Sequence, residues 1–229
     1  MLNAFGLGAV TQLSLVLSVF LVFLFTMPKR LVGALAAFGA GALIAAVSRD
    51  LLPDAHQLNL VQASIWAVLG ASLFILGEQA VHRKFGDEGP AAALGIVIGA
   101  ILDGVPEAII FGVQLASGEA VSMAFIAAVF VSNVPQAVAP SADLKDAGWS
   151  LGRIAGLWGW VVLACGVASL AGYGARGLAD TVTGARMAAF ACGGILAMLC
   201  NSLIPFAHER AKGAGFWMVV GFCASFAIS

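Results

Sequence analysis

The sequence predicts an all-α membrane protein with eight transmembrane helices, and three observations lead to this fold class. First, 61% of the 229 residues are hydrophobic and 10% are charged, and the mean hydropathy is +1.01. Second, apolar runs follow one another along the chain, and a helix needs roughly twenty such residues to cross the hydrocarbon layer. Third, one segment occurs twice in a way that predicts an inverted repeat. The short connections leave no room for a sizeable soluble domain, so residues 1–229 are expected to form a single transmembrane domain.

Charges, prolines and glycine clusters bound the apolar runs and define the expected helix ends. The first run lacks a basic leader and a small-residue cleavage site, so it is expected to remain as a helix rather than be removed as a signal peptide. The expected helices, in chain order with a bounding residue for each, are 4–27 (before Pro28), 31–52 (after Arg30), 58–81 (before His82), 91–116 (after Pro90), 119–140 (ending at Pro140), 153–175 (before Arg176), 183–206 (before His208) and 213–228 (after Lys212).

The distribution of basic residues predicts the orientation. Of the 11 Lys and Arg residues, Arg49, Arg176 and Arg186 lie on one side of the predicted membrane layer, and the others lie on the opposite side. Because cytoplasmic connections carry the excess of positive charge, both termini are expected to face outward from the inner membrane. The basic residues on the cytoplasmic side are Lys29, Arg30, Arg83, Lys84, Lys145, Arg153, Arg210 and Lys212.

Residues 38–56 and 190–208 align at a constant offset without a gap. The two copies belong to the second and seventh expected helices, and five helix steps separate them, so they are expected to run in opposite directions. Inverted repeats are typical of transporters with a midplane site on proline-interrupted helices between the two halves. Identical pairs include Phe38/Phe190, Ala45/Ala197, Leu51/Leu203, Pro53/Pro205, Ala55/Ala207 and His56/His208.

The fourth expected helix carries two carboxylates near its middle, Asp103 and Glu107. They are four residues apart, so a helix places both on one face, one turn apart. Pro106 has no N–H for the carbonyl of Leu102, which predicts a kink and an unpaired oxygen beside the two acids. Carboxylates inside a membrane are costly and usually functional, and these oxygen donors indicate a cation site. The alternative is a protonated or hydrogen-bonded pair of acids within the bundle.

The fifth expected helix repeats this pattern with neutral side chains. Val-Pro-Gln-Ala at 134–137 matches Val-Pro-Glu-Ala at 105–108. Ser132, Asn133 and Gln136 are therefore candidate oxygen ligands that complete the site of the fourth helix. The alternative is that the amides bond across helices without holding an ion, which is common in membranes.

Six further polar residues are candidates for a path through which ions reach and leave this site. They lie on the fourth and fifth expected helices away from the centre, and at the ends of the second and seventh. Solvated helix ends, pairing between neighbours and lipid headgroup contact are the alternative interpretations. In chain order they are Asp54, His56, Gln114, Asp143, His208 and Glu209.

At these motifs the sequence resembles the ZIP family of zinc and iron permeases, and its short bacterial members in particular. That family carries His-Asn-x-Pro-Glu on one mid-chain helix and a second motif ending in Pro-Glu on the next. Laid on this chain, the first motif places Asp103 at the histidine, Gly104 at the asparagine and Glu107 at the glutamate. The resemblance covers essentially the whole chain. It implies a three-two-three arrangement of the eight helices and transport of a divalent metal toward the cytoplasm through a midplane site.

Several positions depart from the family pattern. Asp103, Gly104 and Gln136 stand where a nitrogen or carboxylate ligand is usual, so one ion bound mainly by oxygen is expected instead of two adjoining metals. The resemblance implies zinc as the transported ion, whereas an oxygen shell is better suited to harder cations. Manganese, iron and cadmium are the alternatives, and no resident cofactor is expected.

Other functions compete with transport. With this depleted ligand set, a ZIP-fold protein could instead serve as a non-transporting membrane sensor or binding partner. An intramembrane hydrolase needs a second catalytic carboxylate or a Ser/His pair, and no histidine lies at the depth of Ser132, so no enzyme activity is expected.

Membrane lipid is an expected partner, a homodimer is implied by the resemblance alone, and scattered basic residues give no support for nucleic-acid binding. The four cysteines lie in apolar runs without Cys-x-x-Cys spacing and are expected to be buried free thiols.

Overall fold

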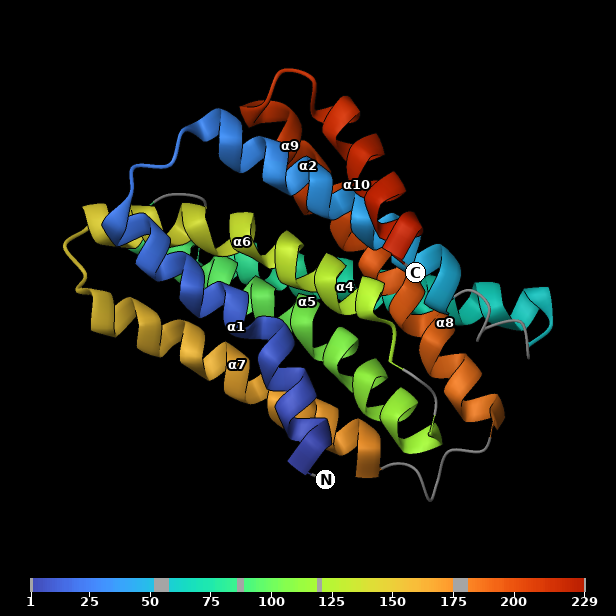
Figure 1. Ribbon diagram of the computed structural model, residues 1–229. Coiled ribbons are helices and arrows are strands. Elements are labelled where there is room, and N and C mark those ends of the chain that lie inside the picture. The colour runs from blue at the N-terminus through green and yellow to red at the C-terminus, as the bar shows by residue number, and fades with distance from the viewer. Residues whose placement is uncertain (1, 52–57, 86–88, 119–120, 175–180, 229) are drawn as a thin grey trace.

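The computed structural model describes residues 2–51, 58–85, 89–118, 121–174 and 181–228, which form one bundle of long helices (Figure 1). No β-strand occurs within these ranges. The elements are α1 (Leu2–Leu24), α2 (Lys29–Ala46), the π-helix η1 (Val47–Leu51), α4 (Leu60–Phe85), α5 (Gly89–Ser117), α6 (Met123–Asp146), α7 (Leu151–Gly174), α8 (Thr181–Met198), the π-helix η3 (Leu199–Leu203), α9 (Ile204–Arg210) and α10 (Ala214–Ile228).

Within the described residues, seven helical segments are long and apolar enough to cross a membrane. The segment that contains α8, η3 and α9 counts as one of them, and α10 is a further, shorter apolar helix. Each expected helix overlaps one of these segments. The predicted all-α membrane architecture is therefore confirmed.

Some expected helix ends are wrong by several residues. α1 ends at Leu24, before an extended stretch that leads into Pro28. α4 continues to Phe85, because the basic residues 82–84 form its last turn, where positive charge interacts favourably with the helix dipole. The seventh span continues through α9 to Arg210, so that its last turns project beyond the expected end at 206.

The fifth span is shifted toward its C-terminus. α6 begins at Met123, where the Ser122 hydroxyl accepts a hydrogen bond of 3.2 Å from the N–H of Phe125 and caps the first turn. The helix then continues past Pro140 to Asp146. A proline in a helix removes one backbone hydrogen bond, and neighbouring helices in a membrane bundle can compensate for that loss.

The two copies of the repeat share a structural feature that their sequences alone do not reveal. Each contains a π-helix, and Val47–Leu51 occupies the same place in the first copy as Leu199–Leu203 does in the second. In the second copy, Pro205 has no N–H for its own helix, and the N–H of Ile204 bonds to the carbonyl of Leu199, five residues earlier. Pro53, its counterpart in the first copy, lies outside the described residues.

The copies run in opposite directions, as an inverted repeat requires. Gly33, near the start of α2, packs against Arg210 and Ala211 at the end of α9. At the other end, η1 contacts α8. Figure 1 shows α2 crossing α9 and η1 approaching α8 in this sense.

Close glycine contacts hold two helix pairs that the repeat relates. α2 packs on α10, and α8 packs on α4. In each pair, a Cβ added to the glycine would overlap a backbone carbonyl oxygen of the partner helix. Small residues at helix contacts are a main source of stability in membranes, where the hydrophobic effect does not drive helices together. The contacts are Gly41 with Met218 and Gly221 with Phe38 in the first pair, and Gly193 with Ala67 and Gly70 with Phe190 in the second.

These contacts extend the repeat to the third and last spans. Trp-Ala-Val-Leu-Gly at 66–70 of α4 corresponds to Trp-Met-Val-Val-Gly at 217–221 of α10. The glycine that ends each segment packs against the phenylalanine that begins each copy of the repeat. The relation between the two halves therefore includes how the helices pack as well as what their sequences share.

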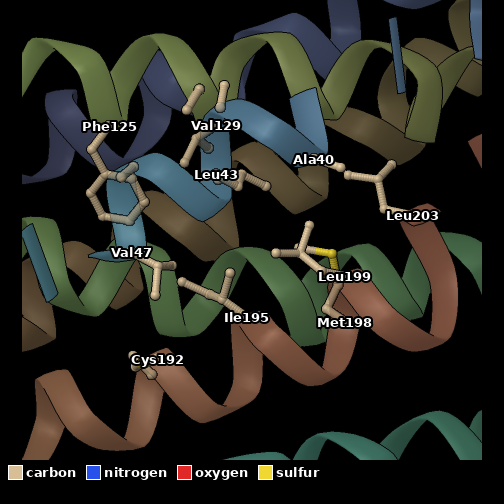
Figure 2. Close-up of a cluster of buried hydrophobic side chains, with 14 of the residues drawn as sticks. Ala40, Leu43, Val47, Phe125, Val129, Cys192, Ile195, Met198, Leu199 and Leu203 are labelled. Atoms are coloured by element: carbon tan, nitrogen blue, oxygen red, sulfur yellow. The ribbon is translucent and has the colours of Figure 1, made fainter. Parts of the chain in front are cut away.

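The largest apolar cluster lies where α2, α6 and α8 meet. Figure 2 shows side chains of these helices and of both π-helices pointing toward one another. Phe125 of α6 also packs on Phe111 of α5, with ring centroids 4.9 Å apart. The residues labelled in Figure 2 are Ala40, Leu43, Val47, Phe125, Val129, Cys192, Ile195, Met198, Leu199 and Leu203.

The cysteines differ in exposure. Cys165 and Cys192 are buried thiols outside any disulfide, as predicted. Cys200 and Cys223 are exposed, so the prediction is wrong for these two. Both lie in apolar sequence but on outer faces of the bundle, a distinction that composition alone cannot make.

Candidate functional site

Glu107 lies within α5 and faces the interior of the bundle, with 2% of its surface exposed. α5 remains helical through Pro106. The helical register places Asp103 one turn before Glu107 on the same face, while the side chain of Asp103 lies outside the described part of the structure. Glu107 is thus a buried carboxyl group inside a segment that is apolar enough to span the membrane.

A glutamine from α1 joins the two motif helices. Asn133 of α6 is buried, and its Nδ2 donates a hydrogen bond of 2.7 Å to Oε1 of Gln12. Gln12 is 1% exposed and also lies against Glu107. Its Nε2 is buried without a hydrogen-bond partner among the described residues. An unpaired buried N–H group costs about 1–3 kcal/mol. Gln12 Nε2 is therefore suited to donate a hydrogen bond to an acceptor in the site, such as an ionised carboxylate.

Gly104 provides the space that Gln12 occupies. A Cβ at this position would lie 2.8 Å from the Cys165 sulfur and 3.1 Å from Gln12 Nε2.

Ser132 is buried one residue before Asn133 on α6. Its hydroxyl donates a hydrogen bond of 3.0 Å to the carbonyl of Val129 in the same helix. Gly39 of α2 packs against it, and a Cβ on that glycine would lie 2.9 Å from the Ser132 Cβ. The hydroxyl oxygen retains lone pairs for a further contact, but the Ser132 side chain is packed closely against α2.

Gln136 is half-buried and lies where a cavity of about 600 Å³ reaches into the bundle. Its Nε2 is 3.8 Å from the sulfur of Met198 in the apolar cluster of Figure 2, a weak contact that leaves the amide oxygen free to act as a ligand. The cavity opens at the ends of α4, α6 and α9, where the basic residues predict the cytoplasmic side. Its lining residues are Phe74, Glu78, Val81, His82, Gly95, Gly99, Ala100, Leu102, Gln136, Ala139, Pro140, Asp143, Ser202, Leu203, Phe206, Glu209 and Arg210.

The structure brings some of the expected path residues to this cavity. Asp143 and Glu209 are exposed and line it, and Glu209 also lies 3.5 Å from the guanidinium of Arg210. His208 is exposed, with Nδ1 3.1 Å from the carbonyl of Ile204.

Neither His208 nor Gln114 is among the residues that line the cavity. Gln114 is 7% exposed, near the other end of α5, and its Oε1 has no hydrogen-bond partner in the described part of the chain. Asp54 and His56 lie outside the described residues.

Sequence reasoning missed Glu78 of α4. Its Oε1 accepts a hydrogen bond of 2.6 Å from the Ser202 hydroxyl, and its Oε2 accepts one of 3.2 Å from Asn201 Nδ2. Both partners belong to η3, so Glu78 links α4 to the π-helix of the second repeat copy and adds a carboxylate to the cavity wall. Glu78 could have been noticed in the sequence, because it is an acidic residue inside the expected helix 58–81. Acidic residues at such positions are usually functional.

Sequence reasoning also missed Gln12. Its signal was a set of polar residues at helical spacing within the apolar first span, since Thr11, Ser14 and Ser18 are fully buried as well. Which side of α1 faces the site is a tertiary fact, and no local pattern indicates it.

The candidate ligands on α5 and α6 offer oxygen atoms of carboxyl, amide and hydroxyl groups. The part of the chain that the structure describes contains no group of three or more His, Cys, Asp or Glu side chains that could hold a metal ion. Oxygen donors are typical of sites for hard cations, whereas imidazole and thiolate favour zinc.

Comparison of the sequence with protein-family models and with curated proteins gives no match. The functional assignment therefore depends on the residues and contacts of the chain itself.

Proposed function

We propose that the protein is a divalent-cation transporter of the ZIP type, with eight helices in a three-two-three arrangement. The observation that carries this proposal is the buried carboxyl of Glu107 inside a spanning helix, against the Gln12 amide of α1, which also accepts a hydrogen bond from Asn133 of α6. A cavity lined by Leu102 of α5 and Gln136 of α6 supports it. A charged group at this depth is costly and is typically retained for a substrate or ion pathway. The transported ion would move toward the cytoplasm across the inner membrane, and both termini would face outward.

In this proposal the cavity is the inward-facing vestibule. It opens at the end of the bundle where Arg83, Lys84 and Lys145 lie, which the distribution of basic residues predicts to be cytoplasmic. The opposite conformation would arise when the two repeat copies exchange their packing around the central helices, as in other transporters with inverted repeats. The shared π-helices and glycine contacts support such an exchange, because both halves are built alike.

The proposed site holds one ion. Asp103 and Glu107 would provide its negative charge, and oxygen atoms of Gln136, Asn133 and Ser132 would complete the shell. Zinc is the substrate that the resemblance implies, while the oxygen donors favour manganese.

Purified protein in liposomes that contain a metal-sensitive dye provides the test. Zinc, cadmium, manganese, iron and cobalt are added outside in turn, and at least one of them is expected to enter. Glu107→Gln is expected to abolish that entry, because it removes the buried charge while keeping the size of the side chain. Asp146→Asn, at the exposed end of α6, is the matched control and is expected to transport normally. Absence of flux for every metal contradicts the transport proposal, and flux that survives Glu107→Gln contradicts the site.

A second candidate follows from the neutral side chains of α6. Asn133 and Gln136 supply no charge, so the fold could bind an ion or a partner as a non-transporting sensor. Binding of a metal to the purified protein without flux in the same liposomes would favour this candidate.

A further inference from the structure

Gln12 is a polar α1 side chain whose amide has contacts with both motif helices. It is 1% exposed, and its Oε1 accepts a hydrogen bond from Asn133 Nδ2 on α6. It also lies against Glu107 on α5, and its Nε2 lies next to the surface of Gly104, one turn earlier on that helix. Three helices therefore meet at a single amide group.

The direction of the Asn133 bond determines which atom of Asn133 remains available. A side-chain amide has one oxygen acceptor and one nitrogen donor group. Since Gln12 Oε1 takes the nitrogen of Asn133, the carbonyl oxygen Oδ1 is the atom that Asn133 can offer to another group. A cation binds oxygen and is repelled by an N–H group, so this orientation suits a cation site.

The nitrogen of the Gln12 side-chain amide, Nε2, is directed toward α5. Nε2 is buried and has no hydrogen-bond partner among the described residues, although Glu107 is its neighbour. An ionised carboxylate forms a strong hydrogen bond with an amide N–H donor such as this one. Gly104 lacks the side chain that would displace Nε2 from this place.

We propose that Gln12 is a positioning residue of the ion site, which orients Asn133 with its oxygen toward the ion and donates Nε2–H to the ionised carboxylate of Glu107. This inference rests on the proposed cation function. It adds a third helix, α1, to a site that the sequence motifs place on α5 and α6. It also accounts for a glycine at position 104, because a side chain there would crowd Gln12 Nε2.

The test measures Mn²⁺ binding to purified protein in detergent, with the free ion followed by electron paramagnetic resonance. Gln12→Met keeps the length of the side chain but loses both hydrogen-bonding atoms, and about tenfold weaker binding is expected. Gln12→Glu keeps an oxygen that accepts from Asn133 but loses the Nε2–H donor, so a weakening smaller than that of Gln12→Met is expected. Thr11→Val is the matched control, because Thr11 is equally buried on α1 but donates to the Gly8 carbonyl of its own helix. It is expected to leave binding unchanged.

Several outcomes overturn the inference. Binding that is unchanged in Gln12→Met, or weakened equally in Thr11→Val, shows that Gln12 has no specific role at the site. Equal weakening in Gln12→Glu and Gln12→Met contradicts the orientation of Asn133. If the methionine variant does not fold, a Gln12→Glu protein that binds tenfold or more weakly than the native protein contradicts it alone. Native protein that binds Mn²⁺ without transporting any metal contradicts the transport proposal alone. Native protein that neither binds nor transports an ion overturns both.

Discussion

Replacing Gly193 by alanine is expected to force α8 and α4 apart. The added Cβ would overlap the backbone carbonyl of Ala67, and a backbone atom cannot move aside as the end of a flexible side chain can. Overpacking of this kind costs about 1–3 kcal/mol. For a chain of this length, a loss of about 2 kcal/mol lowers the melting temperature by about 4–8 °C. The neighbouring Gly194 is the matched control, because a Cβ there would lie 3.8 Å from the Gly70 carbonyl, an ordinary contact.

The native thiols provide the assay. Cys165 and Cys192 are buried and become reactive on unfolding, so a dye that fluoresces on reaction with thiols reports melting in detergent. The exposed Cys200 and Cys223 are first replaced by serine to remove the background. Gly193→Ala is expected to melt at least 4 °C below Gly194→Ala, and equal melting temperatures would refute the close packing of α8 on α4.

Two further predictions use the same melting assay. Glu78→Leu removes the acceptor of two hydrogen bonds that η3 donates, one of them from the Ser202 hydroxyl, and is expected to cost about 1 kcal/mol because the contact is partly solvated. The exposed neighbour Gln79→Leu should melt as the native protein does, and a similar loss in both variants would speak against the link to η3. Trp158→Phe removes the hydrogen bond of 2.9 Å from Nε1 to the Ser141 hydroxyl and opens space in a fully buried position, so a loss of about 1–3 kcal/mol is expected. Trp160→Phe, at a position 70% exposed, should have little effect, and no difference between the two tryptophan variants would contradict the packing of α7 on α6.

The positions of the spanning helices could be predicted because hydropathy alone separates membrane segments from connections. Their ends could not, because caps and turns depend on local hydrogen bonds such as the one from Phe125 to Ser122. Pro140 was a wrong helix end for the same reason, since α6 continues through it to Asp146. The repeat was visible in the sequence, whereas the π-helices were not, because a shift in backbone hydrogen bonding leaves no distinct pattern of residue types.

The candidate site could be predicted only where its residues are close in sequence. Glu107 is buried on α5, and Asn133 and Ser132 are buried on α6, as the two related motifs suggested. Gln12 and Glu78 come from other helices, and only the fold brings them to the site and to the cavity. The side chain of Asp103, to which the motif gives half of the charge, lies outside the described structure, so its role stays a prediction.

The central claim is that a cation reaches Glu107 through the cavity that ends at Gln136. Ala139 lines this cavity between Gln136 and Asp143, and it is not among the proposed ligands. The most direct measurement is metal flux in liposomes before and after a bulky thiol reagent labels Ala139→Cys, in protein whose exposed native cysteines are replaced by serine. Labelling is expected to reduce flux to background, while labelling Asp146→Cys outside the cavity leaves it unchanged. Full flux through completely labelled Ala139→Cys would contradict the claim.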